Sequence, residues 1–373
     1  MWGDIAIAFL IAFLTAFMAT PHTIKIAKKL GAVDTPKDAR RINKVTMPRL
    51  GGLAVLAGFF VSVTYLLIVM TIENKIDLYQ ENYVSKLFGF VVGAGLIGIT
   101  CFIDDVKGVP ALIKLVVQVL AAMIVYKFGI RIDNLDIPGI NVSAIGSWFY
   151  PILTICWIVG ITNAMNLIDG LDGLATGISL ISCLSLLIIF SLNASPLISI
   201  VLITALGGAL CGFLPYNFNP AKTFIGDTGS NFLGYCLSII SILGIAKTYT
   251  AIVIVAPLFV LALPIFDTIW SIIRRLIHGK SLKAIIKPDA EHLHHKMLKK
   301  GFTQKQAVLI MYGISATLGM FAIILMDSGI WKALSFAIII VIIIAAGYKE
   351  FFKQRLLVDI CEDEEIDEEP VEK

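Results

Sequence analysis

The stretch LISIVLITALGGALCGFL, residues 197–214, contains no charged side chain. About 20 apolar residues in a helix span the hydrocarbon core of a bilayer, so this stretch is predicted to be a transmembrane helix. The rest of the chain has the same character, because 58% of its 373 residues are hydrophobic, only 15% are charged and the mean hydropathy is +0.88. A soluble domain has about a quarter of its residues charged. The composition therefore excludes an ordinary soluble protein.

Similar apolar runs recur on both sides of this stretch, and together they predict an all-α polytopic membrane protein with about eleven transmembrane helices. The first run lacks the basic start and the small-residue cleavage site of a signal peptide, so it is taken as a span. The expected spans are residues 3–20, 50–71, 87–103, 111–129, 147–163, 174–192, 197–214, 229–246, 250–270, 307–326 and 331–348.

The positive charges predict the orientation. Most of the 30 Lys and Arg residues fall in segments that share one side if the spans alternate, and such loops stay in the cytoplasm. The N-terminus is then outside, and the C-terminus is cytoplasmic. The cytoplasmic loops are residues 21–49, 104–110, 164–173, 215–228 and 271–306.

Two further segments have distinct compositions. Residues 130–146 alternate polar and apolar side chains around a Pro-Gly turn, which predicts a small extracellular β-hairpin. Residues 349–373 become acidic and have little to bury, so we expect a disordered cytoplasmic tail after a membrane domain of residues 1–348.

Two polar clusters in the predicted cytoplasmic segments carry basic side chains. The first loop contains Lys44 and Arg49, which suit phosphate binding, although cations at such a place can also simply mark topology. The motif DDVKG places Asp104 and Asp105 at the end of an apolar helix, with Lys107 close behind. A carboxylate at membrane depth costs at least about 2.5 kcal/mol, so paired carboxylates indicate function. They could hold a cation or take a proton, while Lys107 binds phosphate.

A third cluster, NAMNLIDGLDG, repeats a polar residue every three positions. Asn163, Asn166, Asp169 and Asp172 would span half the circumference of a helix, since each step of three advances about 60°. Oxygen side chains of this kind are the ligands that Mg²⁺ prefers. The alternative is a turn that is rich in Asn, Asp and Gly for purely structural reasons.

A fourth cluster, NFNPAKTFIGDTGS, contains Asn219, Phe224 and Asp227. Small residues around an Asp before a helix are typical of a nest for anions and a cation. The spacing matches neither a Walker A loop nor GxGxxG, and a simple helix N-cap is the alternative.

The fifth cluster lies in residues 271–306. A zinc site is disfavoured, because the histidines have no Cys partner and no distant carboxylate pattern. Binding of sugar hydroxyls or of a diphosphate is the better hypothesis for Arg274, His292, His294 and His295. Asp267 either joins this site or pairs with a neighbouring Arg.

These motifs support a family resemblance. DDVKG, NAMNLIDGLDG, NFNPAKTFIGDTGS and HLHHK occur in the order found in polyprenyl-phosphate N-acetylhexosamine-1-phosphate transferases. The chain resembles the WecA/TagO branch up to the acidic tail. The resemblance implies transfer of N-acetylglucosamine 1-phosphate from UDP-GlcNAc to undecaprenyl phosphate with release of UMP. The reaction would occur at the cytoplasmic face of a bacterial cell membrane and begin a cell-envelope glycopolymer such as teichoic acid.

The resemblance also implies roles for residues. Asp227 and Asn166 would hold Mg²⁺, for which Mn²⁺ could substitute, Asp104 would deprotonate the lipid phosphate, and Phe224 would stack on uracil. Asn43 stands where relatives often have His, so no acid–base role is assigned there. The full expected set comprises catalytic Asp104, Asp105, Lys107, Asp169 and Asp172, and substrate-binding Lys44, Arg49, Asn163, Asn219, Phe224, Arg274, His292, His294 and His295.

Two alternative functions remain open at this stage, and so does a two-step mechanism in which Asp104 or Asp105 attacks first and forms a covalent phospho-sugar enzyme. The sister branch, MraY, transfers phospho-N-acetylmuramoyl-pentapeptide and would use similar motifs. A polytopic transporter is the rival class, but transporters place polar residues at mid-helix in repeated, broken helices. The polar clusters here lie at the inner ends of the spans. The expected partners are the two substrates and membrane lipid, not nucleic acid, and a homodimer is left open.

Overall fold

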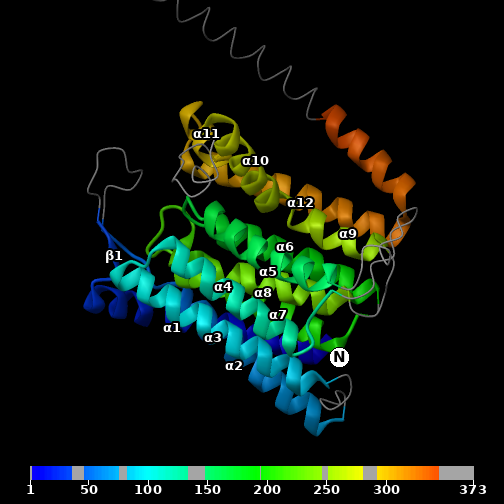
Figure 1. Ribbon diagram of the computed structural model, residues 1–373, viewed down its shortest axis with the longest axis horizontal. Helices are drawn as coiled ribbons and strands as arrows, with labels where there is room; N and C mark the ends of the chain where they lie inside the picture. Colours follow the sequence, from blue (N-terminus) through cyan, green and yellow to red (C-terminus); the bar gives the residue numbers. More distant parts are fainter. Residues whose placement is uncertain are drawn as a thin grey trace, which may run out of the picture. The chain divides into compact units, whose positions relative to one another are not determined.

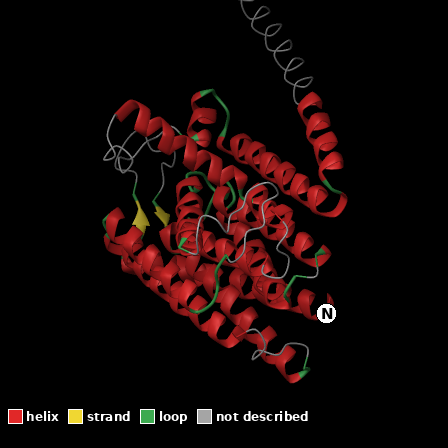
Figure 2. Cartoon of the chain, turned by 45° about the vertical axis from the view of Figure 1, so that its right-hand side comes forward, coloured by secondary structure: helices red, strands yellow, loops and turns green. Residues whose placement is uncertain are grey.

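The computed structural model describes residues 2–35, 46–74, 82–132, 148–193, 195–245, 251–279 and 292–343, and these residues form helices and one short ribbon of two strands (Figures 1 and 2). The helices are α1 Trp2–Leu30, α2 Gly52–Ile72, α3 Tyr83–Lys107, α4 Ala111–Lys127, α5 Phe149–Ile168, α6 Leu174–Leu192, α7 Leu197–Asn217, α8 Gly226–Ile245, α9 Ala251–Val260, α10 Ala262–Gly279, α11 Leu293–Lys299 and α12 Gln304–Ser328.

Within the described residues, 7 helices are long and apolar enough to cross a membrane, namely α1, α2, α3, α5, α6, α7 and α12. The prediction of a helical protein with several membrane spans is therefore confirmed. The count of about eleven spans is not confirmed. Helix α4 has only 17 residues, and α8 is helical where a span was expected but is not among the seven.

The expected span at residues 250–270 is not one continuous helix. It divides at Leu261 into α9 and α10. Pro264 explains the division, because proline has no N–H to donate and its ring clashes with the carbonyl four residues earlier. The described residues 251–270 therefore lie in two shorter helices, and α10 packs against α5.

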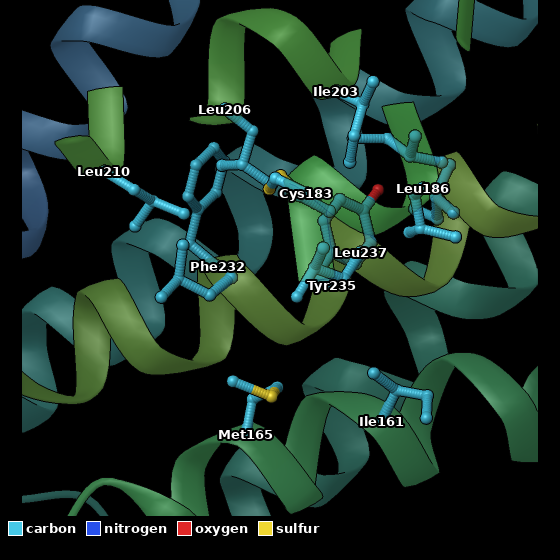
Figure 3. Close-up of a cluster of buried hydrophobic side chains, with 14 of the residues drawn as sticks. Ile161, Met165, Cys183, Leu186, Ile203, Leu206, Leu210, Phe232, Tyr235 and Leu237 are labelled. Atoms are coloured by element: carbon cyan, nitrogen blue, oxygen red, sulfur yellow. The ribbon is translucent and has the colours of Figure 1, made fainter. Parts of the chain in front are cut away.

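Helix α8 is the best-buried helix of the fold. Every described side chain from residue 228 to residue 244 is buried, and α8 packs on α2, α3, α5, α6 and α7. Phe232 and Tyr235 of α8 belong to the same apolar cluster as Met165 of α5 and Leu206 of α7 (Figure 3). A helix that is apolar nearly all round is expected to be buried in this way.

Glycines allow the close approach of neighbouring helices to α8. A Cβ on Gly234 would overlap the α5 backbone at Thr162 and Ile161, and a Cβ on Gly52 of α2 would overlap the backbone of Gly229. The absence of side chains at these two glycines therefore sets how near α2 and α5 lie to α8.

The two-stranded ribbon lies in the first loop. Strand β1, Val33–Asp34, pairs antiparallel with β2, Met47–Pro48. The chain after β2 then pairs with the segment before α8: Phe224 N–H donates to Pro48 O (2.8 Å) and Gly52 N–H donates to Ile225 O (2.8 Å). These contacts hold the first loop against the N-terminus of α8. The hairpin expected at residues 130–146 falls almost wholly outside the described residues.

The chain separates into two compact units, residues 1–326 and residues 327–373. All helices discussed below belong to the first unit apart from the last residues of α12. The second unit contains an apolar helix at Ile330–Ile343. The acidic tail expected at residues 349–373 lies outside the described residues.

Replacing Gly234 with alanine tests the packing of α8. Because the new Cβ would overlap the α5 backbone, Gly234→Ala is expected to lower the free energy of unfolding by about 1–3 kcal/mol, measured as a lower melting temperature in detergent. Gly95→Ala is the matched control, since a Cβ at Gly95 of α3 meets nothing within 4 Å. Equal melting temperatures for the two variants would contradict the close packing of α8 on α5.

Candidate active site

The centre of the site is a lysine held between two carboxylates. Lys114 Nζ donates to Asp104 Oδ2 (2.7 Å) and to Asp227 Oδ2 (2.8 Å). On the other side of Asp227, Asn166 Nδ2 donates to Oδ1 (3.0 Å) and to Ser230 Oγ (2.9 Å). Helices α3, α4, α5 and α8 therefore each contribute a polar side chain to one cluster.

The turn between α3 and α4 brings Asp104 and Lys114 together. Helix α3 ends at Lys107, and Gly108 has φ +77°, a conformation that favours glycine. Val109 N–H donates to Asp104 Oδ1 (2.6 Å), which fixes the carboxylate at the helix end. Helix α4 then begins after Pro110, and its first turn presents Lys114 back toward α3.

The second carboxylate of the DDVKG motif faces a different way. Asp105 Oδ1 accepts a hydrogen bond from Asp227 N–H (2.9 Å), and Oδ2 accepts from Thr228 N–H (2.9 Å) and Thr228 Oγ1 (2.6 Å). The guanidinium of Arg49 lies 3.7 Å from Oδ1. Asp105 thus contacts the first turn of α8 and the first loop, whereas Asp104 contacts Lys114.

A chain of side-chain amides lies beside the central cluster. Asn163 Nδ2 donates to Gln118 Oε1 (2.6 Å), Gln118 Nε2 donates to Asn231 Oδ1 (2.8 Å), and Asn231 Nδ2 donates to Asp227 O (2.9 Å). Gln118 and Asn231 are buried. Buried polar groups of this kind need partners, and here they supply one another and bind the backbone of Asp227.

The helical spacing considered for the four polar residues of NAMNLIDGLDG does not extend to the last two, which lie in the segment expected to be a cytoplasmic loop. Helix α5 ends at Ile168, Asp169 is its C-cap, and Gly173 has φ +76°, so Asp172 lies in the turn before α6. Burial and the nearby carboxylates of Asp227 and Asp105 raise the pKa of Asp169 to about 8.

Asp172 is buried in a contact with the segment after α7. Its Oδ2 accepts from Asn219 Nδ2 (2.9 Å) and from Ala221 N–H (3.2 Å). Asn219 Nδ2 also donates to Gln304 Oε1 (3.1 Å) at the start of α12. Tyr312 of α12 donates from its hydroxyl to Gly173 O (2.5 Å). Two hydrogen bonds with α12, one accepted by Gln304 and one donated by Tyr312, thus support the loops that carry Asp172 and Asn219.

The histidines of HLHHK form a separate group at α11. Asp267 of α10 accepts from His292 Nδ1 (2.7 Å) and from Leu293 N–H (2.9 Å), so one carboxylate holds both the imidazole and the start of α11. His294 is buried, its ring lies 4.2 Å from that of His295, and neither of its nitrogens has a hydrogen-bond partner among the described residues. A Cβ on Gly170 would overlap His294 Nε2, so the ring lies directly against the loop after α5.

The remaining expected residues are less closely connected to the centre. Lys107 is exposed and makes no hydrogen bond to the central cluster within the described part of the chain, so Lys114 is the lysine that lies there. Phe224 is half-buried directly before α8, and Arg274 is half-buried on α10. Lys44 lies outside the described residues.

Sequence reasoning missed Lys114, Gln118 and Asn231. Lys114 was counted only as a positive charge that marks topology. A signal was nevertheless present, because Lys114 and Gln118 lie one helical turn apart on a helix that is otherwise apolar before its last turn. Two polar residues that share one face of such a helix indicate a polar site against which that face packs.

The central cluster offers the kinds of side-chain atom that bind a divalent cation. Asp104, Asp227 and the carboxamide oxygen of Asn166 offer only oxygen donors, as Mg²⁺ prefers. Among the described residues there is no group of three or more His, Cys, Asp and Glu side chains that could enclose a metal. Mg²⁺ usually keeps several waters and binds through one or two carboxylates and substrate phosphates, so Asp104 and Asp227 are carboxylates of the kind it uses.

Comparison with known proteins places the chain in a class. The family model of glycosyl transferase family 4 matches residues 87–245, the stretch that contains Asp104, Lys114, Asn166 and Asp227. This match, together with relatives that are similar over most of the chain, shows that the chain belongs to glycosyl transferase family 4.

Individual relatives cover most of the chain. A Bacillus subtilis (strain 168) protein named probable undecaprenyl-phosphate N-acetylglucosaminyl 1-phosphate transferase is 38% identical over 91% of this chain and 89% of its own length. The decaprenyl-phosphate N-acetylglucosaminephosphotransferase of Mycobacterium tuberculosis (strain H37Rv) is 33% identical over 83% of this chain and 79% of its own. A phospho-N-acetylmuramoyl-pentapeptide-transferase of Staphylococcus epidermidis (strain ATCC 12228) is 30% identical over 83% of this chain and 96% of its own.

Removing the charge of Lys114 tests the central cluster. Lys114→Met leaves Asp104 and Asp227 without their shared cation, and we expect transferase activity to fall at least about a hundredfold, as for loss of one well-placed electrostatic contact in an active site. Lys127→Met is the matched control, because Lys127 is exposed at the far end of the same helix. Wild-type activity in Lys114→Met would show that the bridge has no part in turnover.

Proposed function

We propose that this protein transfers N-acetylglucosamine 1-phosphate from UDP-GlcNAc to undecaprenyl phosphate, giving undecaprenyl-diphospho-GlcNAc and UMP. The observation that carries the proposal is the cluster of Asp104, Lys114, Asn166 and Asp227, which suits a reaction between two phosphates and lies within the family-matched region. The names of the relatives in Bacillus subtilis and Mycobacterium tuberculosis support the choice of sugar.

The proposed site lies at the cytoplasmic face of a bacterial cell membrane. The C-terminal ends of α3 and α5 meet the N-terminal end of α8 at the central cluster, and the C-terminal end of α7 meets the start of α12 at Asn219. Helix ends that meet in this way are expected to share one side of the membrane. We retain about eleven spans with the N-terminus outside, since the basic loops then face the cytoplasm.

The proposed reaction is a phosphoryl transfer. An oxygen of the lipid phosphate attacks the β-phosphorus of UDP-GlcNAc, a new P–O bond forms, and the bond to the UMP oxygen breaks with its electron pair leaving on UMP. Both reactants are anionic, so electrostatic stabilisation and alignment must supply most of the acceleration. UMP is a stable anionic leaving group, so the reaction needs little acid catalysis.

Asp227 and Asn166 would hold Mg²⁺, or Mn²⁺ in its place. When bound, the cation neutralises charge on the diphosphate and polarises the phosphoryl group. The protein itself contributes Lys114, which keeps a positive charge between the two carboxylates, and Asp104, which would accept a proton from the lipid phosphate. Phe224, just before the N-terminus of α8, would stack on uracil.

The HLHHK motif would bind the sugar through hydrogen bonds with uncharged side chains. Burial and the neighbouring His295 lower the pKa of His294 to about 3, so this imidazole is uncharged at neutral pH. A neutral imidazole offers one N–H donor and one acceptor, which suits a hydroxyl or an acetamido group better than a phosphate. Of the two hypotheses for these histidines, sugar binding is therefore favoured for His294.

A paired assay tests the proposed function. Purified protein is given undecaprenyl phosphate and Mg²⁺ with either UDP-GlcNAc or UDP-MurNAc-pentapeptide, each labelled in the sugar. We expect label to pass to lipid from UDP-GlcNAc with equal release of UMP. Transfer only from the pentapeptide donor would instead assign the MraY-type reaction, and uptake of a donor into vesicles without any lipid product would indicate a transporter.

Loss of the Asp227 carboxylate should stop the reaction. Asp227→Asn removes a charge that would hold the cation, and we expect turnover to fall at least about a hundredfold while the protein keeps its melting temperature within a few degrees. Asp327→Asn, at an exposed carboxylate near the end of α12, is the control and should retain full activity. An Asp227→Asn enzyme with nearly normal turnover at all Mg²⁺ concentrations would rule out the metal-binding role.

A further inference from the structure

The N-terminus of α8 requires hydrogen-bond acceptors. The first N–H groups of any helix have no partner within the helix, and α8 begins among buried residues. Two of these groups, the N–H of Asp227 and the N–H of Thr228, donate to the carboxylate of Asp105 at 2.9 Å each. Asp105 lies on α3, so a residue far away in the sequence caps α8.

The Asp105 carboxylate is buried in this contact. Its side chain is 0% exposed, and Oδ2 accepts a third hydrogen bond, from Thr228 Oγ1 (2.6 Å). Gly226 closes the other side: it has φ +72°, and a Cβ there would overlap Arg49 O and crowd both oxygens of Asp105. The carboxylate is therefore enclosed by α8 and the first loop.

The side chains of Asp104 and Asp105 point in different directions. Successive residues of a helix point about 100° apart, so two adjacent side chains face different surroundings. Asp104 is partly exposed and contacts Lys114, whereas Asp105 is buried against the backbone of α8. The chemical role that suits Asp104 does not extend to Asp105.

We propose that Asp105 is a positioning residue, which fixes Asp227 by capping α8 and which neither transfers a proton nor holds the cation. An anion is favourable at a helix N-terminus, and the cap holds the very residue whose side chain faces Asn166 and Lys114. A displacement of about 1 Å at a reacting centre can cost about a hundredfold in rate. The proposal rests on the proposed function for its activity measurements only.

Metal binding and turnover are measured separately to test this role. Mn²⁺ is titrated into the purified protein and followed by electron paramagnetic resonance, which gives a dissociation constant without any substrate. Transfer is then measured over a range of Mg²⁺ concentrations. The variants are Asp105→Asn, Thr228→Val, which removes one donor to Asp105 and keeps its carboxylate, and Thr228→Ser, which keeps the hydroxyl.

We expect Thr228→Val to raise the Mn²⁺ dissociation constant about threefold to tenfold and Asp105→Asn to raise it further, while Thr228→Ser stays near wild type. At saturating metal, kcat of Thr228→Val and Asp105→Asn should return to within about tenfold of wild type. Asp104→Asn, in contrast, should stay severely impaired at every metal concentration.

Two results would overturn the proposal. One is an unchanged Mn²⁺ dissociation constant in Thr228→Val, because a directly ligating Asp105 would not depend on the Thr228 hydroxyl. The other is an Asp105→Asn enzyme whose kcat at saturating metal is as low as that of Asp104→Asn. If the wild-type protein transfers nothing from UDP-GlcNAc and Thr228→Val still weakens Mn²⁺ binding, the proposed function fails and the positioning role stands.

Discussion

A helix that is buried along its length must begin where its free N–H groups find acceptors, and this requirement shapes the centre of the protein. Helix α8 meets it through Asp105 of α3, which accepts from the N–H groups of Asp227 and Thr228. The backbone of the first loop pairs with residues 224 and 225, directly before the helix. Because α2, α3, α5, α6 and α7 all pack on α8, the position of its first turn is tied to the whole bundle. Asp227, which lies in that turn, is consequently held in place from several directions.

The charged side chains around the first turn of α8 stabilise one another. Asp104 and Asp227 both lie within hydrogen-bonding distance of Lys114, and both are mostly withdrawn from water. Electrostatic interactions strengthen as water is excluded, so the lysine offsets a repulsion that would otherwise be large. Arg49 lies near Asp105 and adds a second cation on the other side of the α8 terminus. The proposed site thus combines carboxylates that would hold a cation with basic side chains that would bind phosphate.

Sequence patterns predicted the apolar helices, and the family resemblance, not a pattern, named Asp227 and Asn166 together; the two side chains are joined by a hydrogen bond of 3.0 Å. The patterns did not distinguish Asp104 from Asp105, although the 100° step of a helix implied that only one could face a shared site. Asp172 was expected beside the catalytic carboxylates, but α5 ends at Ile168, and Asp172 binds Asn219 in the turn before α6 instead. The strands at residues 33–34 and 47–48 depend on tertiary pairing, which no local pattern encodes.

The site divides into a charged end and a neutral end. Lysine, arginine and carboxylates gather at α8, whereas His294 is an uncharged imidazole against Gly170, and the carboxylate of Asp267 is taken up by His292 and the start of α11. In a reaction between a lipid phosphate and a nucleotide sugar, the phosphates need cations, and the sugar needs directed hydrogen bonds. In the proposed reaction, a sugar bound at the uncharged His294 would leave the diphosphate to the charged groups at α8. The bond to be broken would then lie beside Asp104 and Lys114.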